Sequence, residues 1–254
     1  MSFSNIKACL EAGDQEKLRT LFTTPERKSG EPPYPTVLPI GRFELDFGAD
    51  AVLERGAIAV REGVITVTLS KAGKSYQLYL YMDMQAPVVC IECPAALEAP
   101  AIHRVPTWEY VGEYLAEVSF AAPHMLDTSE LLGWVQTRPA DPPLCVGCQA
   151  QGRELYLTAV IGEDADSAEA LARTTLDAAT AEEARKFHER ATAWWEAYWK
   201  AVPNVKVPNE RLQFIYDYGM YKFAGLTNPA GVPATLHRRF LGGLARPRLH
   251  RLGR

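Results

Sequence analysis

The first 22 residues carry apolar side chains at the spacing of a helix, with a break in the middle. These apolar positions are Ile6, Cys9, Leu10, Leu18, Leu21 and Phe22. Side chains three and four positions apart lie on one face of a helix. Because the dipeptide Gly13-Asp14 interrupts the series, we predict two short helices, followed by a proline-containing loop over residues 23–39.

From Phe43 the pattern changes to short runs rich in β-branched and aromatic residues, separated by turn sequences such as KAGK at 71–74. Such runs are typical of strands. We predict strands within residues 43–47, 57–61, 64–69, 75–83, 88–93, 114–120, 131–136, 143–149 and 154–162. Strands at close, regular intervals are typical of an antiparallel sandwich.

The segment 108–118 fits two structures. Glu109, Glu113 and Glu117 recur at the spacing of one helix face, whereas the aromatic residues and Gly112 favour a strand. We predict a strand here.

Beyond residue 165 the pattern is helical. Residues 166–202 are rich in alanine and acidic at the start, and Pro203 follows them, so we predict one long helix that ends there. A second helix begins after Asn209, a residue that caps helices well, and ends before Pro229. Its apolar positions are Leu212, Ile215, Tyr216, Gly219 and Phe223.

The aromatic residues near the end of the long helix lie on one stripe. Phe187, Ala191, Trp194 or Trp195, and Tyr198 share a face, and Trp199 widens it. Two interpretations compete for this stripe, a surface that stacks on sugars and a face buried between two layers of the protein. We favour the buried face, because indole rings bury a large apolar area while their N–H groups find partners at the margin.

Composition and charge narrow the class of protein. Hydrophobic residues make up 47% of the 254 and charged residues 23%, which suffices for a sizeable core. The net charge of -4 combines an acidic body with a tail, residues 237–254, that holds six arginines and no acid. An acidic body repels nucleic acid and anionic membranes, so we predict neither as a partner. A weaker alternative is that the arginine tail contacts nucleic acid.

Localisation follows from the apolar runs. The N-terminus lacks the apolar core of a signal peptide, and no run is long enough to span a bilayer, so we predict a cytoplasmic protein.

Two C-x-x-C motifs raise the question of a metal. Cys90 and Cys93 form the first, Cys145 and Cys148 the second, and four thiolates can bind one structural zinc ion. In a strand, however, residues three apart point to opposite faces. We therefore favour buried strand thiols over zinc or an oxidised pair, and we predict no metal site.

The sequence assigns no catalytic or cofactor-binding residue. The five histidines, His103, His124, His188, His237 and His250, are scattered, and we expect each to be a surface or packing residue. No P-loop, dinucleotide-binding glycine pattern, serine-hydrolase motif or zinc-protease motif is present. We therefore predict no cofactor.

The order of the segments resembles glycoside hydrolase family 95, the α-L-fucosidase-like enzymes. IKACLEAGDQEKLRTLF resembles the family's early helical stretch, and YPTVLPIGRFELDF its approach to a strand. ERGAIAVREGVITVTL, ATAWWEAYWKAVPNVKVP and NERLQFIYDYGMYKFAGLTNPAGVPATL resemble later family segments in the same order. The resemblance covers residues 5–236. Related families with the same architecture, such as the maltose phosphorylase-like enzymes, fit as well.

The resemblance implies a mainly β fold with helices. It consists of an antiparallel β-(super)sandwich with short leading helices (1–165), a linker helix (166–203), and the first helix of an (α/α)6 toroid (204–236). Family members have a further β segment before the first helices, and they continue past residue 236 into the toroid. The tail 237–254 departs from the family, which suggests a disordered or frame-shifted end. The catalytic glutamate and the asparagine-aspartate pair of the family lie in the toroid, so we carry over no catalytic residue.

We therefore expect a fragment of an α-L-fucosidase-like glycoside hydrolase. The resemblance implies that the complete enzyme hydrolyses α-linked oligosaccharides, whereas this chain alone is inactive and self-associates through exposed apolar surface. The alternative is a non-catalytic carbohydrate-binding or scaffolding β-sandwich, in which Trp108, Tyr110 and Trp134 contact glycans.

Overall fold

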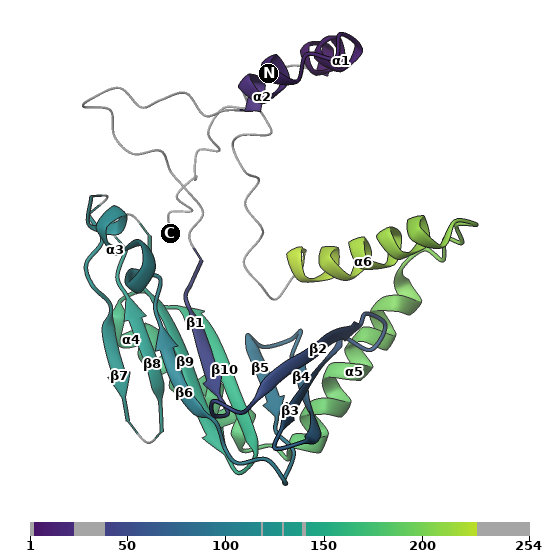
Figure 1. The fold of residues 1–254 in the computed structure, drawn as a ribbon. Coiled ribbons are helices and arrows are strands. Elements are labelled where there is room, and N and C mark those ends of the chain that lie inside the picture. The colour runs from purple at the N-terminus through teal and green to yellow at the C-terminus, as the bar shows by residue number, and fades with distance from the viewer. Residues whose placement is uncertain (1–2, 23–38, 118, 129, 139–140, 228–254) are drawn as a thin grey trace, which may run out of the picture. The chain divides into compact units, whose positions relative to one another are not determined.

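The computed structural model describes residues 3–22, 39–117, 119–128, 130–138 and 141–227 of the chain (Figure 1). Residues 3–22 belong to one compact unit and residues 39–227 to a second. The tail 237–254 and the prolines that follow residue 227 lie outside the described residues.

The first unit contains helices α1 (Phe3–Glu11) and α2 (Gln15–Phe22). Gly13, with a φ of +66°, forms the turn between them in a conformation that suits glycine. The Asp14 carboxylate accepts a hydrogen bond from the Lys17 backbone N–H at 2.9 Å, which caps α2. The two predicted helices and their break are confirmed.

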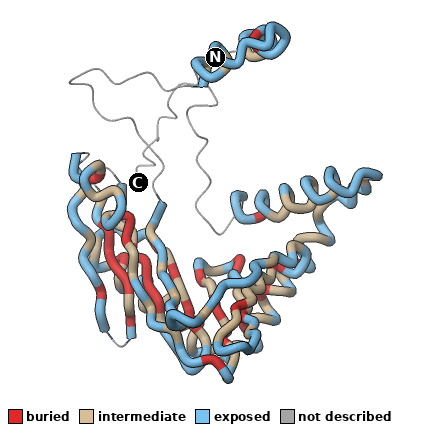
Figure 2. The backbone as a smooth tube through the Cα atoms, in the orientation of Figure 1, coloured by how far each residue is buried: buried red, intermediate tan, exposed pale blue. Residues whose placement is uncertain are grey.

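The second unit is built on one antiparallel sheet of eight strands in the order β2-β3-β4-β5-β10-β9-β8-β7 (Figure 1). The strands are β2 (Val52–Ala59), β3 (Val64–Lys71), β4 (Lys74–Met82), β5 (Val88–Glu92), β7 (His124–Asp127), β8 (Leu132–Gln136), β9 (Leu144–Gln151) and β10 (Glu154–Ile161). Buried residues concentrate in its central strands, whereas the edge strand β2 is largely exposed (Figure 2).

A two-stranded sheet packs on one face of the large sheet. It pairs β1 (Arg42–Asp46) with β6 (Ala101–Val105). Ile102 and Leu45 of this pair contact a cluster around Leu69, Leu78 and Ile91. The antiparallel β architecture is shown, and β6 and β7 are strands that the sequence pattern did not predict.

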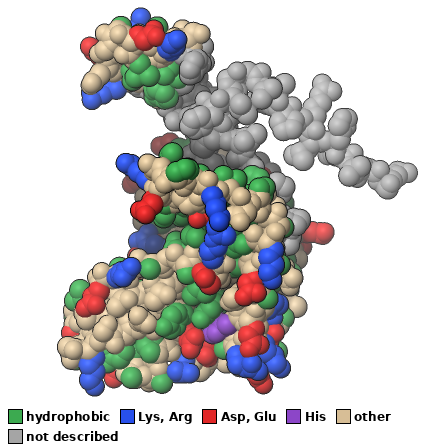
Figure 3. Space-filling model, turned by 90° about the vertical axis from the view of Figure 1, so that its right-hand side faces the viewer, with side chains coloured by type: hydrophobic (Ala, Val, Ile, Leu, Met, Phe, Trp, Pro, Cys, Tyr) green, Lys and Arg blue, Asp and Glu red, His purple; other side chains and the backbone are tan. Residues whose placement is uncertain are grey.

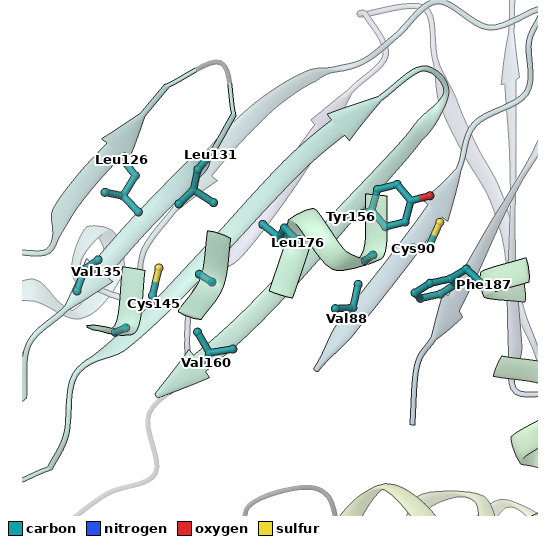
Figure 4. Close-up of a cluster of buried hydrophobic side chains, with 13 residues drawn as sticks. Val88, Cys90, Leu126, Leu131, Val135, Cys145, Tyr156, Val160, Leu176 and Phe187 are labelled. Atoms are coloured by element: carbon teal, nitrogen blue, oxygen red, sulfur yellow. The ribbon is translucent and has the colours of Figure 1, made fainter. Parts of the chain in front are cut away.

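Helices cover the opposite face of the large sheet. Helix α4 (Ala165–Thr180) begins with Asp164, whose side chain accepts from the Ser167 N–H in a capping box. The core between α4, the sheet and the start of α5 contains Val88, Cys90, Leu126, Leu131, Val135, Cys145, Tyr156, Val160, Ala168, Ala172, Leu176, Ala179 and Phe187 (Figure 4). The alanines on the inner face of α4 let the helix lie close to the strands.

The single long helix predicted for residues 166–202 is wrong, because it is two helices. Helix α4 ends at Thr180, and α5 (Ala184–Ala201) begins after Glu183, which has an extended backbone. Alanine-rich sequence favours an unbroken helix, but α4 packs on β9 and β10 while α5 packs on β4. The Arg190 guanidinium binds both Glu182 and Asp83, which ties the bend to the sheet. Val202 caps α5 and Pro203 follows, as predicted.

The predicted strand at 114–120 is also wrong. Residues Trp108–Glu117 form helix α3, with a kink at Val111. The helical spacing of the glutamates was the correct signal. Glu109, Glu113 and Glu117 are exposed on α3, whereas Leu115 of the same helix is buried. A helix needs only one buried stripe to be held in place, so the aromatic content was a poor guide.

Helix α6 (Glu210–Leu226) confirms the second predicted helix. The Asn209 side chain accepts a hydrogen bond from the Leu212 N–H at 3.1 Å, as the predicted cap requires. None of the described helices is long and apolar enough to cross a lipid bilayer.

Candidate functional site

The aromatic residues of α5 form a cluster with α6. We call Trp194, Trp195, Tyr198, Trp199 and Tyr221 the α5–α6 aromatic cluster. The Trp195 ring is 3% exposed and stacks on Tyr221 with ring centroids 4.8 Å apart. The Tyr198 hydroxyl donates to the Met220 carbonyl oxygen at 2.8 Å, which joins the two helices by a hydrogen bond as well.

The same cluster contacts the hairpin between β2 and β3. The Trp199 indole N–H donates to the Val60 carbonyl oxygen at 2.9 Å. The Arg61 guanidinium lies 4.4 Å from the Trp199 ring centroid and binds the Asp217 carboxylate of α6 at 3.1 Å. Gly63, with a φ of +67°, lies directly under the Trp195 ring, where a Cβ would overlap the indole.

These contacts decide between the two interpretations of the aromatic stripe. Phe187, Ala191 and Trp195 are buried along one face of α5. A buried ring cannot stack on a sugar from solution. The packing interpretation is therefore confirmed for Trp195, which holds the hairpin, α5 and α6 together.

The outer side of α6 is apolar and exposed. Leu212, Ile215, Gly219, Phe223 and Leu226 lie within roughly 80° of one another around the helix, given 100° per residue. We call these residues the α6 apolar stripe. Its four large side chains are each more than half exposed, and Ala224, which packs toward α5, lies on the other side of the helix.

Apolar and charged groups mix on the surface of the second unit. On the face drawn in Figure 3, hydrophobic side chains reach the surface among acidic and basic ones of both signs. Isolated apolar residues of this kind are common on soluble proteins. A continuous apolar stripe along a helix is less common and indicates a contact surface.

The three residues predicted to contact glycans do not form one surface. Trp134 of β8 is 1% exposed and packs against Phe43, with ring centroids 5.2 Å apart. Its predicted role as an exposed platform is therefore wrong, because β1 and Gly41 cover the ring. Trp108 and Tyr110 lie on α3 rather than on a strand; Trp108 is half-buried and Tyr110 is 44% exposed.

Trp134 does border a partly open pocket, which we call the Trp134 cavity. Its volume is 170 Å³. Its lining residues are Pro39, Ile40, Thr107, Leu115, Phe120, Trp134, Gln136, Arg138, Asp141 and Leu144. They come from α3, from β8 and β9, and from the segments beside them. No motif marks these residues, so sequence reasoning found only Trp134; mistaking α3 for a strand hid one wall of the cavity.

Cys90, His188 and Glu92 form a chain of three polar side chains under α5. The Cys90 Sγ lies 3.8 Å from His188 Nε2, and His188 Nδ1 lies 3.8 Å from Glu92 Oε2. The order matches a nucleophile, a base and an orienting acid. Burial contradicts this role, because it raises the pKa of the fully buried Cys90 thiol to about 12. A reactive cysteine needs access to solvent and a lowered pKa.

His188 therefore has a packing role, as predicted for the histidines. Its ring stacks on Tyr81 with centroids 3.8 Å apart, which fixes α5 on β4. Burial lowers the pKa of His188, against the opposing effect of Glu92 and Glu154.

The four cysteines of the C-x-x-C motifs are buried thiols, as predicted; Cys90, Cys145 and Cys148 lie in strands, and Cys93 directly follows β5. Cys90 belongs to the core under α4 and Cys93 to the core under β1 and β6, so the two point to opposite faces of the sheet. Burial raises the pKa of Cys145 to about 11 and that of Cys148 to about 12. Among the residues that the structure describes, no three histidine, cysteine or acidic side chains converge as metal ligands would.

Comparison with known proteins adds no relative. No protein-family model matches the chain, and no curated protein matches it significantly. The resemblance to α-L-fucosidase-like enzymes therefore remains a prediction from the order of the sequence segments.

Proposed function

We propose that this chain is the β-rich, non-catalytic part of a glycoside hydrolase similar to the α-L-fucosidase-like enzymes. In this proposal its large sheet is part of the (super)sandwich, α4 and α5 are the linker, and α6 is the first helix of a helical catalytic domain. The order of the sequence segments supports the assignment. The observation that carries it is the α6 apolar stripe.

The α6 apolar stripe gives α6 a second apolar side, as expected of a helix that packs between two layers of a protein. One side of α6 packs on Trp195 of α5 through Ala224 and Tyr221, and the other presents Leu212, Ile215, Phe223 and Leu226 to solvent. A helix that is apolar on both sides is normally buried on both. In the middle of the stripe, Gly219 has nothing within 4 Å of where a Cβ would be, so another helix can approach closely there. We infer that helices of a catalytic domain cover this side.

The proposal gives the described residues a positioning role. Inverting glycosidases need a carboxylic acid and a base roughly 6.5–9.5 Å apart, on either side of the scissile bond. We place both groups in the helical domain, as the resemblance implies, and assign no catalytic residue to the described part of the chain. The α5–α6 aromatic cluster then fixes the angle at which the helical domain leaves the sheet.

A capture assay combined with an activity assay tests the proposal. The tagged chain is expressed in its source cells, purified, and incubated with fucosylated and other α-linked oligosaccharides. We expect the captured complex to release sugar, and we expect the chain purified alone from a foreign host to release none.

A variant with glutamate at two stripe positions, Ile215→Glu with Phe223→Glu, is the specific control. Both side chains are exposed, so the variant should fold while losing the captured activity. A matched variant, Lys74→Glu at the start of β4, should keep it. Turnover by the isolated chain that a point mutation within residues 39–227 abolishes would refute the proposal, as would a captured complex without glycosidase activity.

A further inference from the structure

We propose that the Trp134 cavity binds one neutral polyhydroxylated ring, such as a pyranose sugar or a cyclitol. The inference goes beyond the proposed function and does not depend on it, because the cavity lies on the α3 side of β8 and β9 and uses no residue of α5 or α6.

The size of the cavity sets the size of the ligand. A volume of 170 Å³ is close to that of an engineered protein cavity of about 150 Å³ that accommodates benzene, a single six-membered ring. A disaccharide would need about twice this space. The site therefore suits one ring, either free or at the end of a longer glycan.

The walls combine apolar surfaces with fixed polar groups. Phe120, Ile40 and Leu144, which keep some exposed surface, supply the apolar side of the pocket beside the buried Trp134 ring, and such surface suits the C–H faces of a sugar ring. Gln136 is buried, and its amide nitrogen donates to the carbonyl oxygens of Ala121 and Thr137, both at 2.9 Å. These two bonds occupy both amide hydrogens, so the remaining capacity of the Gln136 side chain is that of an acceptor.

Two more polar groups are held in place by the backbone. The buried Thr107 hydroxyl donates to the Pro39 carbonyl oxygen and lies 3.4 Å from the Tyr110 hydroxyl, and with two lone pairs its oxygen retains capacity to accept one further hydrogen bond. The Arg138 guanidinium donates through Nε and Nη2 to the Pro142 carbonyl oxygen, and within the described part of the chain no hydrogen bond occupies its Nη1 hydrogens. Groups fixed in advance lose little entropy when a ligand binds.

The charge of the lining excludes ions as the preferred ligand. Arg138 and Asp141 are the only formally charged side chains among the described lining residues, and they are opposite in sign. An anion would gain from the arginine and lose to the aspartate, and a cation the reverse. A neutral ring whose hydroxyl groups both donate and accept hydrogen bonds satisfies both residues.

The test is a titration followed by NMR of the tryptophan indole N–H signals, with the Trp134 signal assigned from a Trp134→Phe variant. The probes are L-fucose, D-galactose, D-glucose and myo-inositol, with toluene as an apolar ring and benzoate as an anionic one. We expect at least one hydroxylated ring to shift the Trp134 signal saturably, and we expect toluene and benzoate to bind more weakly.

Variants link binding to the cavity. Arg138→Gln should weaken binding about fivefold, the equivalent of one hydrogen bond worth about 1 kcal/mol. Leu144→Trp fills the space and should abolish binding. If Leu144→Trp does not fold, Asp141→Asn at the rim takes its place as the variant that should weaken binding. Arg153→Gln, the same change as at Arg138 but in the exposed turn between β9 and β10, should bind as the unmodified chain does.

Two outcomes would overturn the inference. The first is the absence of any saturable shift with all four hydroxylated rings. The second is tighter binding of toluene than of every hydroxylated ring, which would make the cavity an apolar packing gap. Neither outcome bears on the capture of glycosidase activity through α6, so the failure of one proposal can be told from the failure of the other.

Discussion

Replacing Gly63 with alanine tests the packing that joins the sheet to the two C-terminal helices. Gly63 closes the turn between β2 and β3, where its N–H donates to the Ala59 carbonyl oxygen at 2.8 Å. Its φ of +67° lies in the left-handed region, which costs a residue with a side chain roughly 1–2 kcal/mol. The new methyl group would also overlap the Trp195 indole, which is buried and stacked on Tyr221 of α6.

The magnitude follows from these two effects. Overpacking a well-filled core costs typically about 1–3 kcal/mol. Alanine also restricts the unfolded chain, which returns about 0.4–1 kcal/mol. We therefore expect Gly63→Ala to lower the free energy of unfolding by about 1–5 kcal/mol, as measured by urea denaturation followed by tryptophan fluorescence.

Gly73→Ala is the matched control. Gly73 lies in the turn between β3 and β4 with a φ of +72°, but nothing lies within 4 Å of where its Cβ would be. It should therefore show the backbone cost alone, about 1 kcal/mol. Equal losses at Gly63 and Gly73 would refute the contact with Trp195.

Trp195→Phe completes the test as a double-mutant cycle. The Trp195 indole N–H is buried without a hydrogen-bond partner in the described part of the chain, so phenylalanine removes no hydrogen bond. It does remove the ring atoms that the methyl group introduced by Gly63→Ala would meet. We expect the loss caused by Gly63→Ala to be smaller in the Trp195→Phe background by about 1 kcal/mol or more.

Three further predictions concern other parts of the second unit. The paired change Ile215→Glu with Phe223→Glu should reduce self-association in analytical ultracentrifugation and leave the free energy of unfolding within about 0.5 kcal/mol, because both side chains are exposed; unchanged sedimentation would contradict this. Cys90 and Cys148 should react with a thiol reagent at pH 8 only as fast as the chain unfolds, because burial raises both pKa values to about 12; fast modification of the native chain would contradict their burial. The pKa of His188 is lowered by burial, so the unfolded chain binds a proton at a higher pH than the folded chain does, and stability should fall as the pH drops below about 6.5. His188→Phe should reduce the fall of the urea midpoint below about pH 6.5. An unchanged slope in this pH range would show that other groups cause the fall in stability.

Local patterns in the sequence were sufficient where a single segment decides its own structure. The break at Gly13, the Asn209 cap and most strands of the sheet depend on residues close together in the chain. The buried face of α5 could also be predicted, because Phe187, Ala191 and Trp195 recur at helical spacing within one helix. The opposite directions of Cys90 and Cys93 follow from strand geometry alone.

Only the tertiary structure decided the rest, because the deciding contacts join residues far apart in the chain. The bend between α4 and α5 depends on Arg190 binding Asp83, which lies 107 residues earlier. The choice of helix for α3 depends on a site that buries Leu115, and the burial of Trp134 depends on Phe43 from the small sheet. Propensity and periodicity describe one segment at a time, whereas burial is a property of segments packed together. For the same reason the Trp134 cavity, whose walls come from separate segments, could not be found before the fold was known.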